Sequence, residues 1–233
     1  MNIAIIPARG GSKRIPKKNI RDFRGKPMIS WSIEVAMQSN CFDKILVSTD
    51  SKDIALIAEK NGAWVPFLRP KELSDDFTTT KDVIVHSINW LETNNLQLNY
   101  ICCIYATAPF IKAKDLRESF ELIKRQKKDR LIFSATNFSF PIQRAIKLNN
   151  EGISSMFYPE NFQIRSQDLE KAYHDAGQFY LAKPQLWFKK DNLFEDSMPF
   201  LIPSWRVQDI DEEDDWKRAE MLHQIIEKNI KDK

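Results

Sequence analysis

The sequence has few cysteines, few glycines and no long apolar run, and each shortage excludes a class of protein. Three cysteines in 233 residues, at positions 41, 102 and 103, form an odd set without metal-ligand spacing, so we predict a reducing compartment and a cytoplasmic protein. The longest apolar stretch, residues 100–111, is too short and too interrupted to span a bilayer. No positive charge precedes the first apolar run, so we expect no signal peptide and no membrane partner.

The overall charge is close to balanced, which excludes a second class. The 35 Lys and Arg residues against 32 Asp and Glu residues give a net charge of +3, too little for a generic nucleic-acid binder. The local charge is uneven, however. Residues 9–28 hold eight basic side chains and one acidic one, and residues 209–215 hold six acids in seven positions. Such segregation predicts that the basic loop and the acidic cluster have a function beyond solvation.

Apolar runs typical of strands alternate with helical patterns over the first 136 residues. We expect strands at residues 3–6, 44–48, 64–67, 100–105 and 131–136, and helices at residues 28–37, 53–60, 80–92 and 115–124. This alternation predicts an α/β fold with a mostly parallel sheet and helices on both faces. Late strands are expected at residues 178–181 and 200–202. A closing helix is expected from the spacing of Trp216, Ala219, Leu222, Ile225, Ile226 and Ile230.

The alternation is interrupted at residues 138–171, which show no clean period. Aromatic side chains recur there, at Phe138, Phe140, Phe157, Tyr158 and Phe162. The segment is too small to bury these side chains by itself. We therefore predict one domain over residues 1–233 with an insertion at 138–171 that packs against another surface, such as a second subunit.

The loop after the first expected strand combines glycine with positive charge. Gly10 and Gly11 are two of only six glycines, and glycine permits positive φ and a close approach of backbone N–H groups to a ligand. Ligands of open α/β sheets bind at the carboxyl ends of strands, where Arg9, Lys13 and Lys18 would lie. The loop therefore predicts a polyphosphate site, although its spacing matches neither a P-loop nor a dinucleotide fold. A tight turn with solvated lysines is the alternative.

Several short motifs, in order along the chain, resemble a known family. They are Ile6-Pro7-Ala8-Arg9-Gly10-Gly11-Ser12-Lys13 with Pro16, Lys18 and Asn19, then Val47-Ser48-Thr49-Asp50, Arg69-Pro70, Glu72-Leu73-Ser74-Asp75, Ala106-Thr107-Ala108-Pro109 and Asp209-Ile210-Asp211. As an ordered set they resemble the cytidylyltransferases that activate acidic nine-carbon sugars, which include the CMP-sialic acid synthetases. Residues 67–70, 102–105, 157–160, 165–169 and 173–180 are similar to the branch of that family that acts on pseudaminic acid.

The resemblance implies a Rossmann-like fold with a small inserted dimerisation subdomain at residues 138–171, and a nucleotidyltransferase activity. The implied reaction transfers CMP from CTP to the anomeric hydroxyl of a nonulosonic acid, pseudaminic acid above all, and releases pyrophosphate. The same reaction on legionaminic or sialic acid is the alternative. Mg²⁺ as the cofactor and a homodimer are implied as well, and no nucleic-acid partner is expected.

The resemblance also implies roles for single residues. Lys18 and Arg9 are expected to be catalytic and to contact the CTP phosphates. The expected nucleotide-binding residues are Ala8, Arg9, Gly10, Gly11, Ser12, Lys13, Lys18, Asn19, Arg69 and Thr79. Asp209 and Asp211 match the family's metal-binding pair, and carboxylate oxygens are the ligands that Mg²⁺ prefers. Without the resemblance, an acid-rich helix N-terminus is the more common interpretation of these two residues.

The segments expected to face the sugar depart from the sialic acid pattern. His174-Asp175-Ala176-Gly177 replaces the Arg-Pro-Asn-Gly of that pattern, so the sugar is expected to differ. The expected sugar-binding residues are Tyr105, Arg165, His174 and Gln178. With the family's arginine missing, we predict that Arg165 binds the sugar carboxylate, across the dimer interface if the insertion reaches the partner's site. A surface salt bridge to Asp168 or Glu170 is the alternative. Arg14 also departs from the pattern, because sialic acid enzymes usually carry glycine there.

Two other classes of function stay open. A nucleic-acid-binding protein could use the charges of residues 9–26, although no recognition fold is evident. A catalytically silent relative could bind nucleotide without turnover, although Lys18, Asp209 and Asp211 argue against it.

Overall fold

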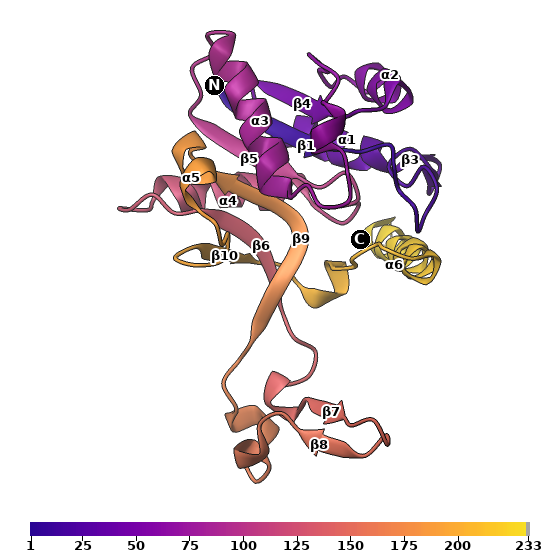
Figure 1. The fold of residues 1–233 in the computed structure, drawn as a ribbon, viewed down its shortest axis with the longest axis vertical. Helices are drawn as coiled ribbons and strands as arrows, with labels where there is room; N and C mark the ends of the chain where they lie inside the picture. Colours follow the sequence, from indigo (N-terminus) through magenta and orange to yellow (C-terminus); the bar gives the residue numbers. More distant parts are fainter. Residues whose placement is uncertain (232–233) are drawn as a thin grey trace.

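The computed structural model describes residues 1–231, and a six-stranded sheet forms its centre (Figure 1). The strands follow the order β10-β6-β9-β5-β1-β4. Their bounds are β1 Asn2–Pro7, β4 Lys44–Ser48, β5 Tyr100–Ile104, β6 Ile132–Asn137, β9 Tyr173–Ala182 and β10 Met198–Leu201. Neighbouring strands run parallel except where β9 pairs with β5 and β6. The predicted mostly parallel sheet is therefore confirmed.

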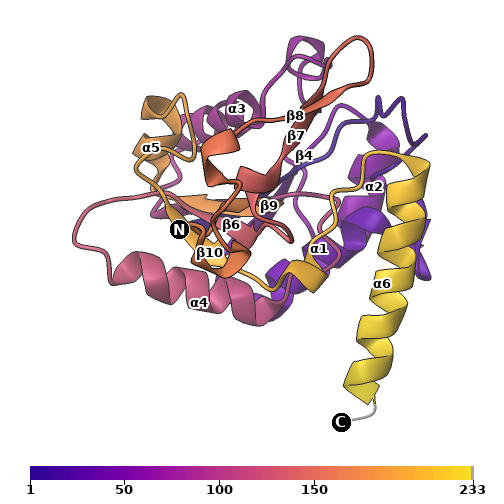
Figure 2. The same ribbon diagram turned by 90° about the horizontal axis from the view of Figure 1, so that it is seen from below.

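Helices cover both faces of the sheet (Figures 1 and 2). The bounds are α1 Met28–Ser39, α2 Lys52–Lys60, α3 Thr80–Thr93, α4 Ala113–Lys124 and α5 Pro184–Lys189. Apolar residues of α1, α2 and α4 pack on one face together with Ala4 and Ile6, and those of α3 and α5 pack on the other together with Ile3 and Ile5. Both faces of β1 are thus buried, which is why its sequence is continuously apolar rather than alternating.

The last helix, α6 (Glu213–Lys231), packs outside the sheet against a small hairpin, β2 (Asp22–Phe23) and β3 (Lys26–Pro27). Trp216 meets Phe23 edge-to-face at 5.4 Å between ring centroids. Ile15 and Ile210 are buried in the same cluster. This cluster fastens the acidic segment before α6 to the basic loop after β1. The side chain of Ile230, expected on the apolar face of this helix, lies outside the described residues.

Residues 138–172 leave the sheet between β6 and β9 and extend away from its lower edge (Figure 1). They contain the hairpin of β7 (Ile146–Leu148) and β8 (Ser154–Met156) and short 3₁₀ helices. Large apolar side chains are exposed along this insertion, at Phe138, Phe140, Ile146, Leu148, Ile153, Phe157, Tyr158, Phe162 and Ile164. The insertion therefore leaves most of its apolar surface uncovered in a single subunit.

One expected strand is wrong. Residues 64–67 run beside β4, but they and Leu68 form only two isolated bridges, Leu46 to Trp64 and Thr49 to Leu68. Pro66 lies between them and has no N–H to donate, so a continuous ladder cannot form. Among the described residues, every helix is too short or too polar to cross a membrane.

Candidate functional site

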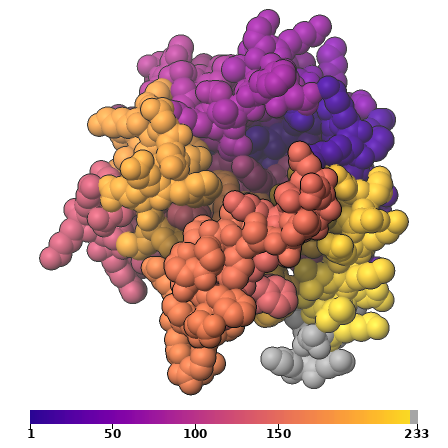
Figure 3. Space-filling model, turned by 60° about the horizontal axis from the view of Figure 1, so that its bottom comes forward, coloured from indigo at the N-terminus to yellow at the C-terminus, as the bar shows by residue number. Residues whose placement is uncertain are grey.

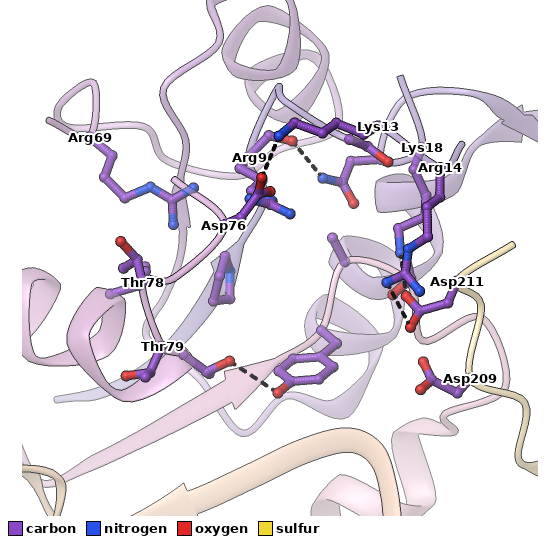
Figure 4. A pocket seen from close by; sticks show the side chains of 18 residues that line it. Arg9, Lys13, Arg14, Lys18, Arg69, Asp76, Thr78, Thr79, Asp209 and Asp211 are labelled. Carbon is purple, nitrogen blue, oxygen red and sulfur yellow. Dashed lines mark hydrogen bonds and ion pairs between the residues drawn. The ribbon is translucent and has the colours of Figure 1, made fainter. Parts of the chain in front are cut away.

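A cavity of about 640 Å³ opens at the carboxyl end of β1. Its walls are the loop after β1, the segment that leads into α3, the residues after β5 and the acidic segment before α6. Figure 3 shows the surface hollowed between the N-terminal part of the chain and the insertion. Five cationic side chains line the cavity: Arg9, Lys13, Arg14, Lys18 and Arg69 (Figure 4). Positive charge of this density at a sheet edge fits a polyanionic ligand.

The basic loop, residues 9–28, is held in place by one buried side chain and by hydrogen bonds. Ile15 is fully buried and anchors its middle, and the buried Asn19 side chain donates to the backbone oxygen of Arg9 at 2.9 Å. The N–H of Gly10 donates to Asp50 Oδ1 at 2.8 Å, and a Cβ at this position would lie 3.0 Å from Ser51 Cβ. Neither Gly10 nor Gly11 uses the positive φ that glycine permits. In this loop, Lys17 rather than Gly10 or Gly11 adopts a positive φ, of 53°.

Arg9 and Lys13 converge on one carboxylate. Arg9 Nη1 lies 2.6 Å from Asp76 Oδ1, and Lys13 Nζ lies 2.6 Å from Asp76 Oδ2 (Figure 4). These two cations lower the pKa of Asp76, chiefly through their hydrogen bonds. The Asp76 carboxylate therefore lies where an anionic group is bound by both cations. A phosphate of a ligand could bind to the same two cations in place of this carboxylate.

Lys18 and Arg14 converge on the acidic segment. Lys18 Nζ donates to the backbone oxygen of Ile210 at 2.7 Å and to Asp211 Oδ1 at 3.3 Å, and Arg14 Nη2 lies 2.9 Å from Asp211 Oδ2. Asp209 lines the same cavity. Burial raises the pKa of Asp209, the neighbouring charge of Asp211 raises it further, and Lys18 opposes both. The two carboxylates thus repel each other in a place where a cation would relieve the repulsion.

Arg69 is the most buried of the five cations, with 5% of its surface exposed. Its Nε donates to Ser74 Oγ at 3.2 Å, and its backbone N–H donates to the oxygen of Thr49 at 2.7 Å. Burial lowers the pKa of Arg69, Asp50 raises it, and Arg9 lowers it. The guanidinium keeps further N–H donors available on the cavity side.

The N-terminus of α3 forms the opposite wall. Thr79 caps the helix through a reciprocal pair of hydrogen bonds with Asp82, and Thr80 Oγ1 lies 3.0 Å from Tyr105 Oη. Burial raises the pKa of Tyr105 to about 12, so its hydroxyl keeps its proton at physiological pH. This wall presents neutral hydroxyl groups, in contrast to the charged wall around Lys18.

The cavity brings together most of the residues expected from the sequence. Those that line it are Arg9, Ser12, Lys13, Lys18, Asn19, Arg69, Thr79, Tyr105, Asp209 and Asp211. Ala8, Gly10 and Gly11 belong to the loop but are not among its lining residues. Ala8 is buried, and its N–H donates to the backbone oxygen of Ser48.

Three of the four expected sugar contacts, Arg165, His174 and Gln178, lie outside the main cavity. Arg165 is exposed on the insertion, and its Nε pairs with Asp168 Oδ2 at 2.7 Å, which is the alternative weighed for it. His174 borders a separate hollow of about 390 Å³. Gln178 is buried, and its Nε2 donates to the backbone oxygen of Arg206 at 2.7 Å. Within one subunit, Tyr105 alone of the expected sugar contacts lines the main cavity.

Two acidic residues, Asp76 in the lining of the main cavity and Asp175 in that of a neighbouring hollow, were not predicted from the sequence. Asp76 is the second of two adjacent aspartates before a run of three threonines, a pattern that by itself indicates only a polar turn. Asp175 belongs to the segment that departs from the sialic acid pattern. That departure was the available signal, but it did not indicate which side chain of the segment matters.

The comparisons with known proteins agree with this geometry. The family model described as cytidylyltransferase matches residues 3–195. The pseudaminic acid cytidylyltransferase of Campylobacter jejuni is 45% identical over 226 residues, which cover 96% of this chain and 97% of that protein. The chain belongs to the cytidylyltransferase family. As a member of this family, it is a CTP-dependent nucleotidyltransferase, and the cationic loop lies at the end of its sheet where a nucleotide would bind.

Two further relatives extend the comparison of this cytidylyltransferase. The CMP-N,N'-diacetyllegionaminic acid synthase of Legionella pneumophila is 32% identical, with 96% of each chain covered. The solved structure of a CMP:2-keto-3-deoxy-manno-octonic acid synthetase complexed with CTP superimposes with a TM-score of 0.70 at 16% identity, covering 96% of this chain and 98% of that one. The second likeness concerns the fold, which both chains share over nearly their whole length.

Proposed function

We propose that this cytidylyltransferase transfers CMP from CTP to the anomeric hydroxyl of pseudaminic acid and releases pyrophosphate. The observation that carries the proposal is the cavity in which five cations face Asp209 and Asp211 at the carboxyl end of β1. The similarity to the Campylobacter jejuni protein, at 45% identity over 96% of the chain, supports the choice of sugar.

The chain's residues act chiefly by positioning and by neutralising charge. The anomeric oxygen attacks the α-phosphorus in line, the bond from phosphorus to the pyrophosphate oxygen breaks, and the hydroxyl proton leaves to solvent or a nearby base. Arg9 and Lys13 would exchange Asp76 for phosphate oxygens. Lys18, with 19% of its side chain exposed, would meet the negative charge that grows at the reacting phosphate.

Asp209 and Asp211 fit a bound Mg²⁺. Both carboxylates line the cavity, the pKa of Asp209 is raised by burial and by Asp211, and the donor set consists of hard oxygen atoms. Among the described residues, no group of three or more His, Cys, Asp or Glu side chains could hold a metal ion. A pair suffices for Mg²⁺, because this ion keeps waters and takes its other ligands from substrate phosphates. When bound, the ion would neutralise phosphate oxygens and orient the triphosphate.

The metal assignment is tested by replacing each aspartate with its isostere. Asp209→Asn or Asp211→Asn should raise the Mg²⁺ concentration needed for half-maximal rate, because each removes one anionic ligand. Direct Mn²⁺ binding, followed by electron paramagnetic resonance, should weaken in the same variants. An unchanged Mg²⁺ titration and unchanged Mn²⁺ binding in both variants would return the segment to its alternative role as a helix start.

The reaction itself is tested with CTP, Mg²⁺ and a panel of nonulosonic acids, by following pyrophosphate release. Pseudaminic acid should give the highest kcat/KM of the panel. Faster turnover of a legionaminic or sialic acid would change the sugar but keep the reaction, and no pyrophosphate with any member would contradict the proposal.

We further propose that the protein works as a homodimer in the cytoplasm. The uncovered apolar side chains of the insertion support pairing of two copies. The three cysteines are free thiols, and Cys102 and Cys103 are fully buried, which supports a reducing compartment.

A further inference from the structure

A second hollow, of about 590 Å³, adjoins the nucleotide cavity. The two share Thr79, Thr80 and Tyr105 as lining residues. The second hollow is completed by Lys81 and Asp82 of α3, by Asp175 and Tyr180 of β9, and by residues 191–194 after α5. If the proposed function is correct, an acceptor sugar must lie beside the α-phosphate, and this neighbouring hollow offers the space for it.

Asp175 is held in the wall of this hollow by two hydrogen bonds. Its Oδ1 accepts a hydrogen bond from the N–H of Gly177 at 2.9 Å, and its Oδ2 accepts one from the hydroxyl of Tyr180. Burial raises the pKa of Tyr180 far above its ordinary value, so the phenol stays a donor. Each carboxylate oxygen has two lone pairs, so each can accept one further hydrogen bond.

An irregularity in β9 sets the position of Asp175. Phe133 of β6 pairs with Tyr180 of β9, and Ala135 of β6 pairs with Asp175 of β9. Between these two pairs the chain advances by two residues in β6 but by five in β9, so β9 contains extra residues. The extra residues include Gly177, whose φ is +60°. Such bulges re-aim a side chain next to a binding site, and here the bulge brings a carboxylate and its phenol partner to the same hollow.

The other carboxylates that line this hollow have different roles. Asp191 pairs with Lys81 at 2.9 Å, and Asp82 caps α3 through Thr79. Asp175, in contrast, is held by an uncharged phenol and a backbone N–H. Its negative charge is therefore the one least neutralised by partners within the described lining of the hollow.

An anion here constrains how an acidic sugar can bind. The sugar's own carboxylate would be repelled by Asp175 and drawn to cations outside this hollow, because Lys81, the cation that lines it, is paired with Asp191. The far end of the sugar would then face Asp175. Groups that donate hydrogen bonds are favoured there, and an acylamino N–H is such a donor, whereas an acceptor is disfavoured.

We propose that Asp175 is a specificity-determining residue whose carboxylate accepts a hydrogen bond from an acylamino N–H of the acceptor sugar. Tyr180 is a positioning residue that fixes the orientation of this carboxylate. The proposal rests on the proposed function, since it names the group that recognises the sugar in that reaction.

The test compares Asp175→Asn with wild type at saturating CTP, with Asp129→Asn as the control. Asp129 pairs with Lys183 on the surface, so the control removes the same carboxylate charge away from both hollows. Asp175→Asn should raise the sugar KM about 10- to 100-fold, the typical loss for a hydrogen bond to a charged group. Its CTP KM should change less than about 2-fold, and Asp129→Asn should match wild type in both constants.

Analogues of the sugar identify the group that Asp175 reads. In each analogue one acylamino group is replaced by hydrogen. For the analogue that lacks the recognised N–H, the KM values of wild type and Asp175→Asn should become equal. The inference is overturned if the sugar KM of Asp175→Asn is unchanged, if the CTP KM rises equally, or if every analogue keeps the full difference.

Two further measurements keep the outcomes separate. If Asp175→Asn does not fold, Tyr180→Phe replaces it, with an expected rise in sugar KM that is smaller but again confined to the sugar, and an unchanged sugar KM would overturn the inference. If wild type releases no pyrophosphate with any nonulosonic acid, the proposed function itself fails. Normal wild-type turnover with an unaltered Asp175→Asn contradicts only the role of Asp175.

Discussion

At the scale of single residues, the site is a set of cations whose partners are carboxylates of the protein itself. Arg9 and Lys13 hold Asp76, and Arg14 and Lys18 hold Asp211. The pairs keep the cationic side chains gathered before any ligand binds. Under the proposed function, a triphosphate would compete with these carboxylates for the same donors.

Lys18→Ala is expected to cripple turnover while leaving the fold intact. Lys18 lines the main cavity, and its Nζ lies 2.7 Å from the backbone oxygen of Ile210 in the acidic segment. Loss of one such group costs about 10²–10³ in rate. The measurement is kcat in a purified variant whose circular dichroism and Tm match wild type. Near-normal turnover in that folded variant would remove Lys18 from the catalytic set.

Asp76→Asn is expected to strengthen CTP binding. The carboxylate lies 2.6 Å from both Arg9 and Lys13, and the amide that replaces it holds these cations less firmly. Because the pairs are exposed, the CTP KM should fall only about 2- to 5-fold, with the sugar KM unchanged. Isothermal titration with CTP gives the same comparison without turnover. A rise in CTP KM would instead mean that Asp76 supports the bound state.

The sequence indicated the cationic half of the site better than the neighbouring hollow that we propose for the sugar. Arg9, Lys13 and Lys18 follow a strand within a few residues, so the sheet edge places them together whatever the tertiary details. Gln178 and His174 were expected at the sugar because their segment is unusual. Side chains along a regular strand point alternately to its two faces, and the bulge in β9 changes this alternation. Asp175 and Tyr180 therefore both line the second hollow.

At the scale of elements, strand positions followed from apolar runs, but strand direction and continuity did not. β9 runs antiparallel to β6 because the chain returns beside β6 after the insertion. The residues of β9 do not by themselves indicate this direction. Residues 64–67 have the composition of a strand, yet Pro66 breaks their ladder at the sheet edge. In both cases a neighbouring element, rather than local propensity, determined the outcome.

Docking of α6 should depend on pH through His223. This histidine is buried on α6, with its ring centroid 4.4 Å from that of Trp31 and 5.5 Å from that of Phe23. Burial lowers the pKa of His223 from its ordinary value of 6.5, Glu227 opposes this, and Arg24 and Lys26 add to it. The unfolded chain therefore binds the proton more readily than the folded one just below pH 6.5, and stability falls as the pH falls through that window.

The expected result is a Tm that decreases between about pH 7.5 and about pH 5.5, and a smaller decrease in His223→Gln. Differential scanning calorimetry at several pH values measures both slopes. His86 keeps part of the slope in the variant, because burial lowers its pKa as well. Equal slopes in wild type and His223→Gln would show that α6 does not carry this pH dependence.

At the scale of the whole molecule, the second hollow and the insertion are connected through the same strand, β9. The insertion extends from the strands β6 and β9, and β9 also carries Asp175 and Tyr180 of the second hollow. Apolar residues such as Phe140 and Phe157 are exposed on the insertion, at 82% and 55% of their surface. A second copy packed on this surface would cover them and would bring its own insertion to a fixed place relative to the first subunit's site.

Arg165 allows this arrangement to be tested. Within the described residues, its side chain pairs with Asp168 and with no other residue, and it is 72% exposed. The guanidinium is therefore accessible to a sugar bound in another subunit. We expect light scattering to give a dimer, and Arg165→Ala to raise the sugar KM about 10-fold or more while the CTP KM stays nearly unchanged, because the sugar carboxylate loses a fork-shaped donor. A 27.3 kDa species at micromolar concentration would contradict the dimer.

Mixing two variants decides whether Arg165 acts within its own subunit or across the interface. Lys18→Ala subunits keep Arg165, and Arg165→Ala subunits keep Lys18, so a mixed dimer has one complete site if the arginine crosses and none if it does not. After subunit exchange, random pairing makes half of the dimers mixed, and activity at low sugar concentration should recover to about one quarter of wild type. With no recovery, the arginine does not serve the partner's site. If Arg165→Ala also lowers CTP affinity, or changes neither KM, the arginine does not belong to the sugar site at all.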